Sequence, residues 1–161
     1  MKSSITASML YDFVICPHRV TMDLFRKPTE KDPISPFVQL LWERGNAFEK
    51  EVIEKLKIPF LNLRIVPDPE RERLTREAIA AGESLIYGGR IRSGDLLGEP
   101  DLLKKQNNGY VAGDIKSGAG LEGAGEDTDG KPKEHYAVQL ALYTEILERQ
   151  RICGGRMPFV W

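Results

Sequence analysis

The chain has 161 residues, of which 41% are hydrophobic and 29% are charged, and its formal net charge is -1. This composition predicts one globular domain and excludes an intrinsically disordered protein. The small net charge excludes general attraction to polyanions, so any contact with nucleic acid must use a local basic patch. No run of about 18 apolar residues and no segment typical of a secretory leader is visible, so we expect a cytoplasmic protein without membrane contact.

The N-terminal residues 1–34 are predicted to form a helical lead-in. Apolar side chains recur at helical spacing from Thr6 to about Phe25, and Pro17 is expected to divide this stretch into two short helices. The lead-in precedes a core that we place at residues 35–161.

Two further helices are predicted from their start signals. Ser35 followed by Pro36 is typical of an N-cap and a first-turn proline, and the apolar positions behind them indicate the longest helix in the first part of the chain. Asp68 and Pro69 repeat this signal, and Gly82 is placed to end the second helix.

The pattern then changes to short β-compatible runs. Residues 85–93, 95–105 and 110–117 predict three consecutive strands, and the Gln-Asn-Asn-Gly sequence at 106–109 predicts a hairpin turn between the last two. Residues 118–133 are rich in glycine and acidic residues without periodicity, and we interpret them as a mobile loop.

A last helix is predicted at residues 135–150. The chain ends in the apolar stretch from Pro158 to Trp161, which resembles a strand cut short. We therefore expect the core to be truncated at its C-terminus.

The predicted hairpin places charged residues inside apolar runs. If residues 107–108 form the turn, Asp101 lies directly opposite Asp114; if residues 108–109 form it, Asp101 faces Lys116. Either register puts all three charged side chains on one face, whereas a three-residue turn would separate them. Carbon atoms of facing side chains lie about 4.5 to 5.5 Å apart, close enough for two carboxylates to hold one small cation.

Two adjacent carboxylates repel each other unless a positive charge lies between them. Oxygen ligands without His or Cys favour magnesium or manganese over zinc. Such a metal lowers the pKa of a bound water and offsets charge on a phosphoryl oxygen, so the pattern indicates phosphodiester hydrolysis. The alternative is that Asp101 and Asp114 are solvated acids on an exposed face, paired with Lys116.

Four sequence elements resemble the PD-(D/E)xK nucleases, and in particular their RecB-like branch. Gly-Glu-Pro-Asp at 98–101 and Asp-Ile-Lys at 114–116 resemble the defining signature. Gln-Leu-Ala-Leu-Tyr at 139–143 is similar to the QxxxY motif of that branch, and Arg-Gly-Asn-Ala-Phe-Glu at 44–49 is similar to its upstream element. The order and the spacing of the four elements agree with the family.

The resemblance implies roles for individual residues. Metal ligands for Mg²⁺ or Mn²⁺ would be the side chains of Glu49, Asp101 and Asp114 and the backbone carbonyl of Ile115. Lys116 would position or activate the attacking water. Gln139 and Tyr143 would orient the site and contact DNA. The branch often has His where this chain has Glu49, and the alternative for Glu49 is an exposed helical acid.

The implied protein is a single RecB-like nuclease domain over residues 1–161, with an α/β restriction-endonuclease-like core. A mixed central sheet would carry the metal on its hairpin, flanked by helices. The implied activity is metal-dependent hydrolysis of single- or double-stranded DNA in repair, recombination or defence. Related proteins, which include CRISPR-associated exonucleases, often carry a second nuclease-like or helicase domain. The alternative is a catalytically silent DNA-binding or assembly module on a nuclease fold.

Two smaller features complete the sequence reading. Cys16 before Pro17 resembles the first ligand of iron-sulfur variants in this branch, but only Cys153 could join it, so two of four thiolates are present and we expect no cluster. Arg90 and Arg92 are candidate contacts for DNA phosphates.

Overall fold

The computed structural model describes residues 4–118, 121–122 and 130–161. Within these residues the chain is a mixed α/β protein with five α-helices and mixed sheets. The helices are α1 (Ala7–Ile15), α2 (Pro17–Phe25), α3 (Pro36–Lys55), α4 (Asp68–Ala81) and α5 (Glu134–Arg149), and a short 3-10 helix spans Pro28–Glu30. None of the helices in this described part is long and apolar enough to cross a membrane.

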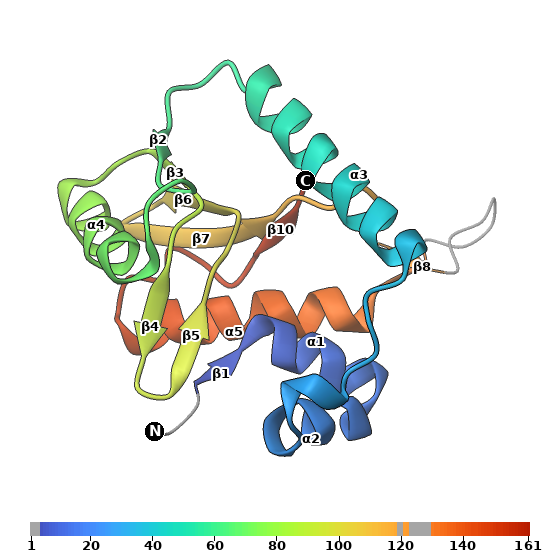
Figure 1. Cartoon of the computed structure of the whole chain (residues 1–161). Helices are drawn as coiled ribbons and strands as arrows, with labels where there is room; N and C mark the ends of the chain where they lie inside the picture. The colour runs from blue at the N-terminus through green and yellow to red at the C-terminus, as the bar shows by residue number, and fades with distance from the viewer. Residues whose placement is uncertain (1–3, 119–120, 123–129) are drawn as a thin grey trace.

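The largest sheet has five strands in the order β10-β7-β6-β3-β2. These strands are β2 (Leu61–Asn62), β3 (Leu85–Tyr87), β6 (Leu102–Gln106), β7 (Gly109–Asp114) and β10 (Phe159–Val160). The three central strands pair antiparallel, and the two edge strands join in parallel. In Figure 1 α3 lies above this sheet, α5 runs below it with α1 alongside, and α4 lies at the left.

The β6–β7 hairpin confirms the first of the two predicted registers. Its two-residue turn begins at Asn107, whose φ of 51° lies in the left-handed region that Asn tolerates. Leu102 pairs with Gly113. The next pair in this register is Asp101 and Asp114, so the two acids lie opposite each other.

The structure corrects the prediction of three consecutive strands, because the first two runs are each broken. The run at 85–93 is interrupted at Gly88, whose φ is 70°. The run at 95–105 is interrupted before Pro100, which has no N–H to donate to a ladder. A second sheet, in the order β1-β5-β4, is formed by the short strands β1 (Ile5–Thr6), β4 (Ile91–Ser93) and β5 (Leu96–Gly98). Asp101 therefore lies where the chain passes from one sheet to the other.

The central sheet is buried on both faces, as its alternating side chains require. On the α5 face the core includes Ile86, Leu103, Ala112, Leu140, Tyr143, Ile146 and Leu147. On the α3 face it includes Leu85, Tyr87, Leu102 and Ile115, packed against Phe48, Val52, Ile53 and Leu56. The C-terminal half of α3 supplies this contact, whereas the N-terminal half exposes Phe37, Leu40, Leu41 and Trp42.

The predicted helix starts agree closely with the structure. The lead-in is divided into α1 and α2 at Pro17, and the Ser35 side chain caps α3 by accepting a 3.3 Å hydrogen bond from the N–H of Val38. Helix α4 begins one residue earlier than its signal indicated, since Pro67 is its N-cap. Gly82 ends α4 with a φ of 78°, as a C-terminal glycine should.

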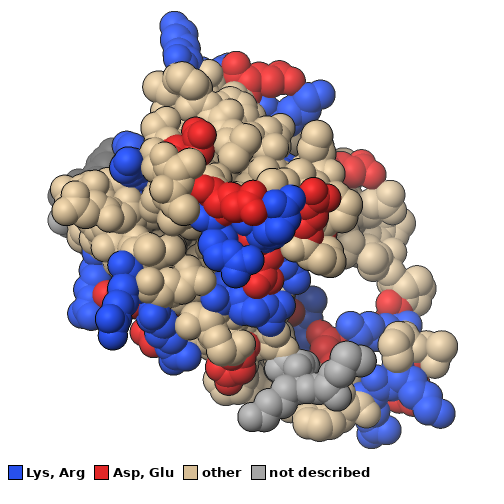
Figure 2. Space-filling view, turned by 90° about the vertical axis from the view of Figure 1, so that its left-hand side faces the viewer, with Lys and Arg blue, Asp and Glu red and all other residues tan. Residues whose placement is uncertain are grey.

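The predicted loop at 118–133 is described only in part. Two short strands, β8 (Leu121–Glu122) and β9 (Lys131–Pro132), pair antiparallel. Residues 119–120 and 123–129 lie outside the described residues, and so does most of the predicted mobile loop. Figure 2 shows the side of the molecule that carries α4, where basic and acidic side chains lie close together.

Candidate metal and catalytic site

Asp101 and Asp114 meet at the end of the β6–β7 hairpin. Asp114 is the last residue of β7 and only 2% exposed. Its Oδ1 accepts a 3.5 Å hydrogen bond from the N–H of Asp101. Oδ2 of Asp101 accepts a 2.8 Å hydrogen bond from the N–H of Ile115. Each acidic side chain is therefore fixed by the backbone segment of the other.

The electrostatics of this pair are unfavourable when both acids are ionised. Burial raises the pKa of Asp101 to about 7, and the charges of Asp114 and Glu49 add to the rise. The N–H of Ile115 and the ammonium of Lys116 oppose it without cancelling it. A buried acidic pair with this imbalance requires further positive charge before both carboxylates ionise near neutral pH.

Lys116 lies beside the acidic pair, as the sequence predicted. Its Nζ is 3.2 Å from Oδ2 of Asp114. The same Nζ lies 5.5 Å from the centre of the Tyr136 ring, and Nζ of Lys133 lies 5.4 Å from that centre. The face of an aromatic ring attracts an ammonium group. Tyr136 and Asp114 together therefore hold Lys116 next to the candidate site.

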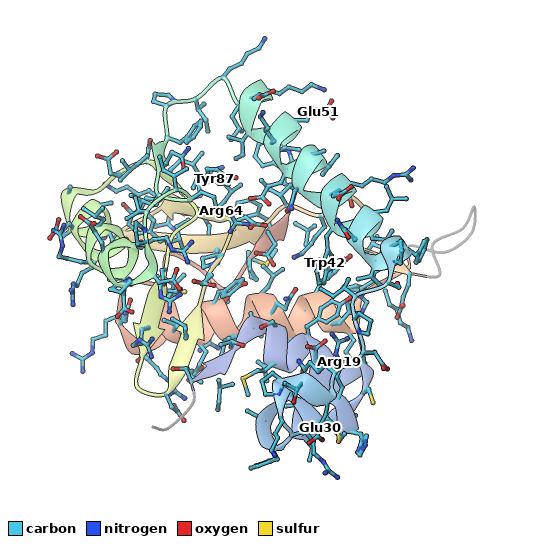
Figure 3. The ribbon with its side chains drawn as sticks, viewed as in Figure 1. Arg19, Glu30, Trp42, Glu51, Arg64 and Tyr87 are labelled. Atoms are coloured by element: carbon cyan, nitrogen blue, oxygen red, sulfur yellow. The ribbon has the colours of Figure 1, made fainter. Side chains whose placement is uncertain are left out.

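Glu49 points toward the site, but its oxygens have other partners. The hydroxyl of Tyr87 donates a 2.8 Å hydrogen bond to Oε1, and Nη2 of Arg64 lies 3.5 Å from Oε2. Figure 3 shows Arg64 and Tyr87 next to each other in the region between α4 and α3. The Glu49 side chain is 12% exposed, so the alternative of an exposed helical acid is wrong. Its charge reaches Asp101 without a direct contact.

These acids do not form a complete metal site in the described conformation. Across residues 4–118, 121–122 and 130–161, no group of three or more His, Cys, Asp or Glu side chains is arranged to hold a metal ion. The nearest approach to such a site is the pair of Asp101 and Asp114. The predicted ligand Glu49 influences Asp101 through its charge, and its two oxygens also contact Tyr87 and Arg64.

The donor chemistry of the pair nevertheless fits a hard divalent cation. Both side chains offer oxygen only, which magnesium and manganese prefer. Burial, and then the charge of Asp114, raise the pKa of Asp101, so a cation bound beside the pair would favour its ionised form. The backbone of Ile115 is adjacent, since its N–H already contacts Asp101. Among the described residues, Asp101 and Asp114 are thus well placed to hold such an ion.

Tyr143 and Gln139 lie one turn apart on α5 and differ in their surroundings. Tyr143 is 4% exposed, and burial raises its pKa, with Asp114 and Asp101 adding to the rise. It therefore lies beside the acidic pair. Both side chains line a cavity of about 180 Å³ together with Glu99, but Gln139 makes no contact with the acidic pair that the structure records. Its Oε1 is buried and accepts no hydrogen bond from any described residue.

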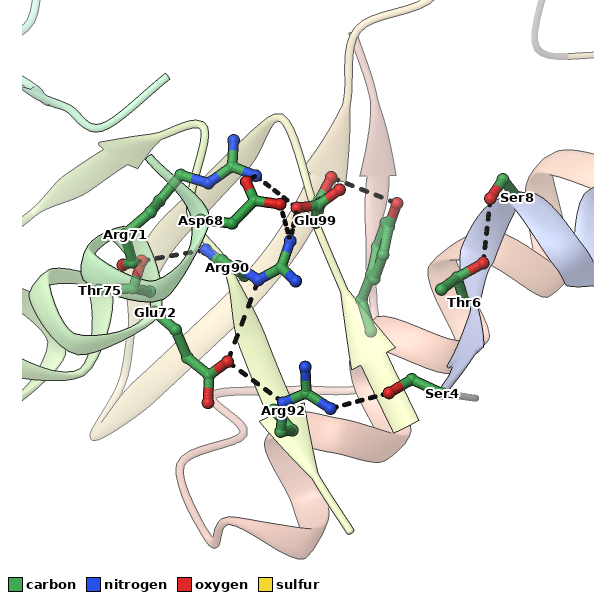
Figure 4. Close-up of polar contacts among 11 residues, drawn as sticks. Ser4, Thr6, Ser8, Asp68, Arg71, Glu72, Thr75, Arg90, Arg92 and Glu99 are labelled. Atoms are coloured by element: carbon green, nitrogen blue, oxygen red, sulfur yellow. Dashed lines mark hydrogen bonds and ion pairs between the residues drawn. The ribbon is translucent and has the colours of Figure 1, made fainter. Parts of the chain in front are cut away.

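A second charged cluster surrounds Glu99, two residues before Asp101. Its carboxylate contacts the guanidinium groups of both Arg71 and Arg90 (Figure 4). Arg71 and Arg90 also pair with Asp68, at 2.6 and 3.0 Å. The backbone oxygen of Glu99 accepts a 3.5 Å hydrogen bond from the hydroxyl of Tyr143, which connects this cluster to the candidate site.

This cluster changes the interpretation of the predicted phosphate contacts. The Arg90 side chain is 13% exposed and its guanidinium is ion-paired. Arg92 contacts Glu72 at 3.2 Å and donates to the Ser4 hydroxyl at 2.8 Å. Both arginines are therefore committed to internal contacts, and a DNA phosphate would have to compete with nearby carboxylates for them.

Sequence reasoning missed Arg64, Tyr87 and the pairing of Glu99. Arg64 follows the two-residue strand β2 and has no periodic pattern around it. Tyr87 lies in an apolar strand, where an aromatic residue predicts only core packing. The one available signal was Gly88, because a glycine that interrupts a strand often marks close approach of another backbone segment.

Comparisons of the chain with protein-family models, with curated proteins and with solved structures found no match. The resemblance to PD-(D/E)xK nucleases therefore remains a prediction from the sequence.

Proposed function

We propose that the chain is a magnesium- or manganese-dependent deoxyribonuclease that hydrolyses phosphodiester bonds at the end of the β6–β7 hairpin. The observation that carries this proposal is the buried pair of Asp101 and Asp114, which lie opposite each other with insufficient positive charge around them. The four sequence elements that resemble RecB-like nucleases support it independently. A bound divalent cation would supply an activated water and would offset charge on the phosphoryl oxygens.

The protein's own residues then have distinct tasks. Asp101 and Asp114 bind the cation. Lys116, held between Asp114 and the Tyr136 ring, orients the attacking water or stabilises charge that develops on the phosphate. Tyr143 packs against the acidic pair and fixes the preceding segment through the oxygen of Glu99.

The test is cleavage of labelled single- and double-stranded DNA with magnesium, with manganese and with a chelator. We expect cleavage that requires metal and falls by at least about a hundredfold in Asp114→Asn and Asp114→Ala, because a group acting on the transition state is lost. Asp95→Asn is the matched control, since Asp95 is an exposed aspartate in the β4–β5 turn. Equal cleavage by the Asp114 and Asp95 variants would exclude the proposed site.

The second candidate function is a catalytically silent DNA-binding or assembly module. It is favoured by the arrangement of Glu49, whose carboxylate is held by Tyr87 and Arg64 rather than by the acidic pair. Under this alternative the folded protein binds DNA equally well with chelator and with magnesium, and does not cleave it. Metal-dependent cleavage excludes this alternative.

The biological setting follows only from the sequence resemblance. On that basis we propose a role in DNA repair, recombination or defence, with exonuclease action as the first activity to test. Degradation of an end-labelled duplex and of a closed circle separates exonuclease from endonuclease action. A further nuclease-like or helicase domain in a longer protein would be consistent with the same proposal.

A further inference from the structure

We propose that Arg64 binds a non-bridging oxygen of a nucleic-acid phosphodiester beside the Asp101–Asp114 pair. This inference rests on the proposed function, because it assigns a substrate contact to the same site. It concerns a residue that none of the four family-like sequence elements contains.

The backbone of Arg64 is held close to the candidate site by Gly88. A Cβ added to Gly88 would lie 2.7 Å from the Arg64 Cα and 2.8 Å from its N, so only glycine permits this approach. Gly88 in turn donates a 2.8 Å hydrogen bond to the backbone oxygen of Asp101. The N–H of Arg64 is also bound, at 3.0 Å, by the side chain of Asn62. Arg64 therefore starts from a fixed position next to the acidic pair.

The side chain of Arg64 has fewer ion pairs and is more exposed than those of Arg71 and Arg90. Arg71 and Arg90 each contact two carboxylates or more and are 9% and 13% exposed. Arg64 is 41% exposed, and its one ion pair among the described residues is the 3.5 Å contact with Glu49. A planar guanidinium with donors open to solvent is well suited to bind two phosphate oxygens at once.

The charge of the site explains why a phosphate needs this arginine. Asp101, Asp114 and Glu49 are acidic, and Lys116 is already paired with Asp114. A phosphodiester would meet net negative charge from the chain's own side chains. Arg64 contacts Glu49, whereas Lys116 contacts Asp114, so the two cations flank different acids of the site. Arg64 thus offers a phosphate a positive charge that is separate from that of Lys116.

The contact with Glu49 gives the competing interpretation, in which Arg64 only neutralises that acid. The two interpretations predict different effects of removing Arg64 on the affinity for DNA and on the affinity for divalent cations. If Arg64 binds phosphate, its removal weakens DNA binding and leaves fewer counterions released per DNA molecule bound. If it only neutralises Glu49, its removal makes the site more acidic, so divalent cations bind more tightly while DNA binding is unchanged.

The experiment measures binding of a short fluorescent oligodeoxynucleotide by anisotropy at several salt concentrations, with calcium and with a chelator. For Arg64→Gln we expect about tenfold weaker binding, the loss of one charge-assisted hydrogen-bonded contact. The slope of log affinity against log salt should fall by about 0.7 on single strands or about 0.9 on duplex. Arg64→Lys should keep the slope but lose part of the affinity, because a lysine cannot form the two-pronged contact.

Arg73→Gln is the matched control, since Arg73 is half-exposed on α4 and paired with Glu70 and Glu77. It should leave both affinity and slope unchanged. Circular dichroism and thermal melting establish that each variant is folded. Unchanged affinity and slope in Arg64→Gln, with tighter calcium binding, would overturn the inference.

Magnesium-dependent cleavage by the unaltered chain, measured in parallel, separates this inference from the nuclease proposal. Cleavage together with wild-type DNA binding by Arg64→Gln rejects the Arg64 contact and keeps the nuclease. A smaller salt slope for DNA binding in Arg64→Gln, without any cleavage by the unaltered chain, supports the Arg64 contact and rejects the nuclease proposal. Failure of the folded chain to bind DNA rejects the contact directly.

Discussion

Glu99 and Asp101 are acidic residues separated by a single proline, yet their electrostatic surroundings are opposite. The carboxylate of Glu99 contacts the guanidinium groups of Arg71 and Arg90. Asp101 instead faces Asp114, and burial raises its pKa to about 7. The chain neutralises one acid with its own arginines and leaves the other without enough positive charge.

The difference separates a structural from a functional use of charge. The Glu99 cluster ties α4 to the connection between the two sheets, and every ion in it has a partner of opposite sign. Two buried acids with only Lys116 as a counter-charge destabilise the fold when both are ionised, and the proposed function assigns them to a cation. Substitutions in each cluster in turn test whether the two clusters differ in this way.

The largest effect is expected for Arg71→Ala. Its side chain is 9% exposed and contacts the half-exposed carboxylates of Asp68 and Glu99, so its removal deletes buried packing as well as these ion pairs. We expect a loss of about 3 kcal/mol in the free energy of unfolding, measured with urea. Arg73→Ala, an exposed arginine on the same helix, should change it by less than about 0.5 kcal/mol. Equal effects of the two variants would show that the Glu99 cluster does not stabilise the fold.

The next effect concerns Asp101 and depends on pH. Its pKa is raised from 3.8 to about 7 in the folded chain, so the folded state holds a proton that the unfolded state releases. Without divalent cations, stability from this group is complete below about pH 4 and is lost as the pH rises through about 7. Asp101→Asn should therefore be more stable than the wild type at pH 8, by about 2 kcal/mol after allowing for partial exposure.

Urea unfolding in chelator at pH 5 and at pH 8 measures this difference. Asp95→Asn serves as the control, because an exposed aspartate should give no pH-dependent gain. At each pH the stability of Asp101→Asn is compared with that of the wild type. If the gain is no larger at pH 8 than at pH 5, the acidic pair is already compensated within the chain.

A smaller effect is expected from divalent cations themselves. Magnesium or manganese should raise the melting temperature at pH 8, because the folded pair binds the ion and the unfolded chain does not. At ten times the dissociation constant the gain is about 1.4 kcal/mol. The gain should disappear in Asp114→Asn and persist in Glu99→Gln, which lies in the compensated cluster. Loss of the gain in both variants would contradict the separation of the two clusters.

The local parts of this picture could be predicted from the sequence. The β6–β7 turn follows from the turn chemistry of consecutive Asn residues and Gly109. The sequence left two registers open, both with Asp101 and Asp114 on one face, and the structure has the one in which they lie opposite each other. The helix starts at Ser35 and near Asp68 are equally local. Pro100 and Gly88 carried signals for the strand breaks that the apolar pattern obscured.

The remaining contacts depend on residues far apart in the chain. Arg71 and Glu99 are brought together only when α4 packs beside the connection between the sheets. Glu49 acquires as partners Tyr87 from strand β3 and Arg64 from the turn that follows β2. No periodicity encodes such pairings, because each arginine and each acid has several possible partners of similar charge. The sequence could therefore predict the acidic pair but not which other acids were already compensated.

Glu49 is compensated less fully than Glu99 and more fully than Asp101. The smallest expected effect comes from removing its hydrogen bond from Tyr87. Tyr87→Phe removes a 2.8 Å donor from a partly buried carboxylate, so we expect a loss of about 1 kcal/mol in stability without cations. If Glu49 also binds the ion, loss of this orienting contact should reduce the melting-temperature gain with magnesium. Tyr110→Phe is the control, since its hydroxyl donates to the backbone oxygen of Glu83. A magnesium response that is the same in both variants would place Glu49 outside the metal site and restrict that site to Asp101 and Asp114.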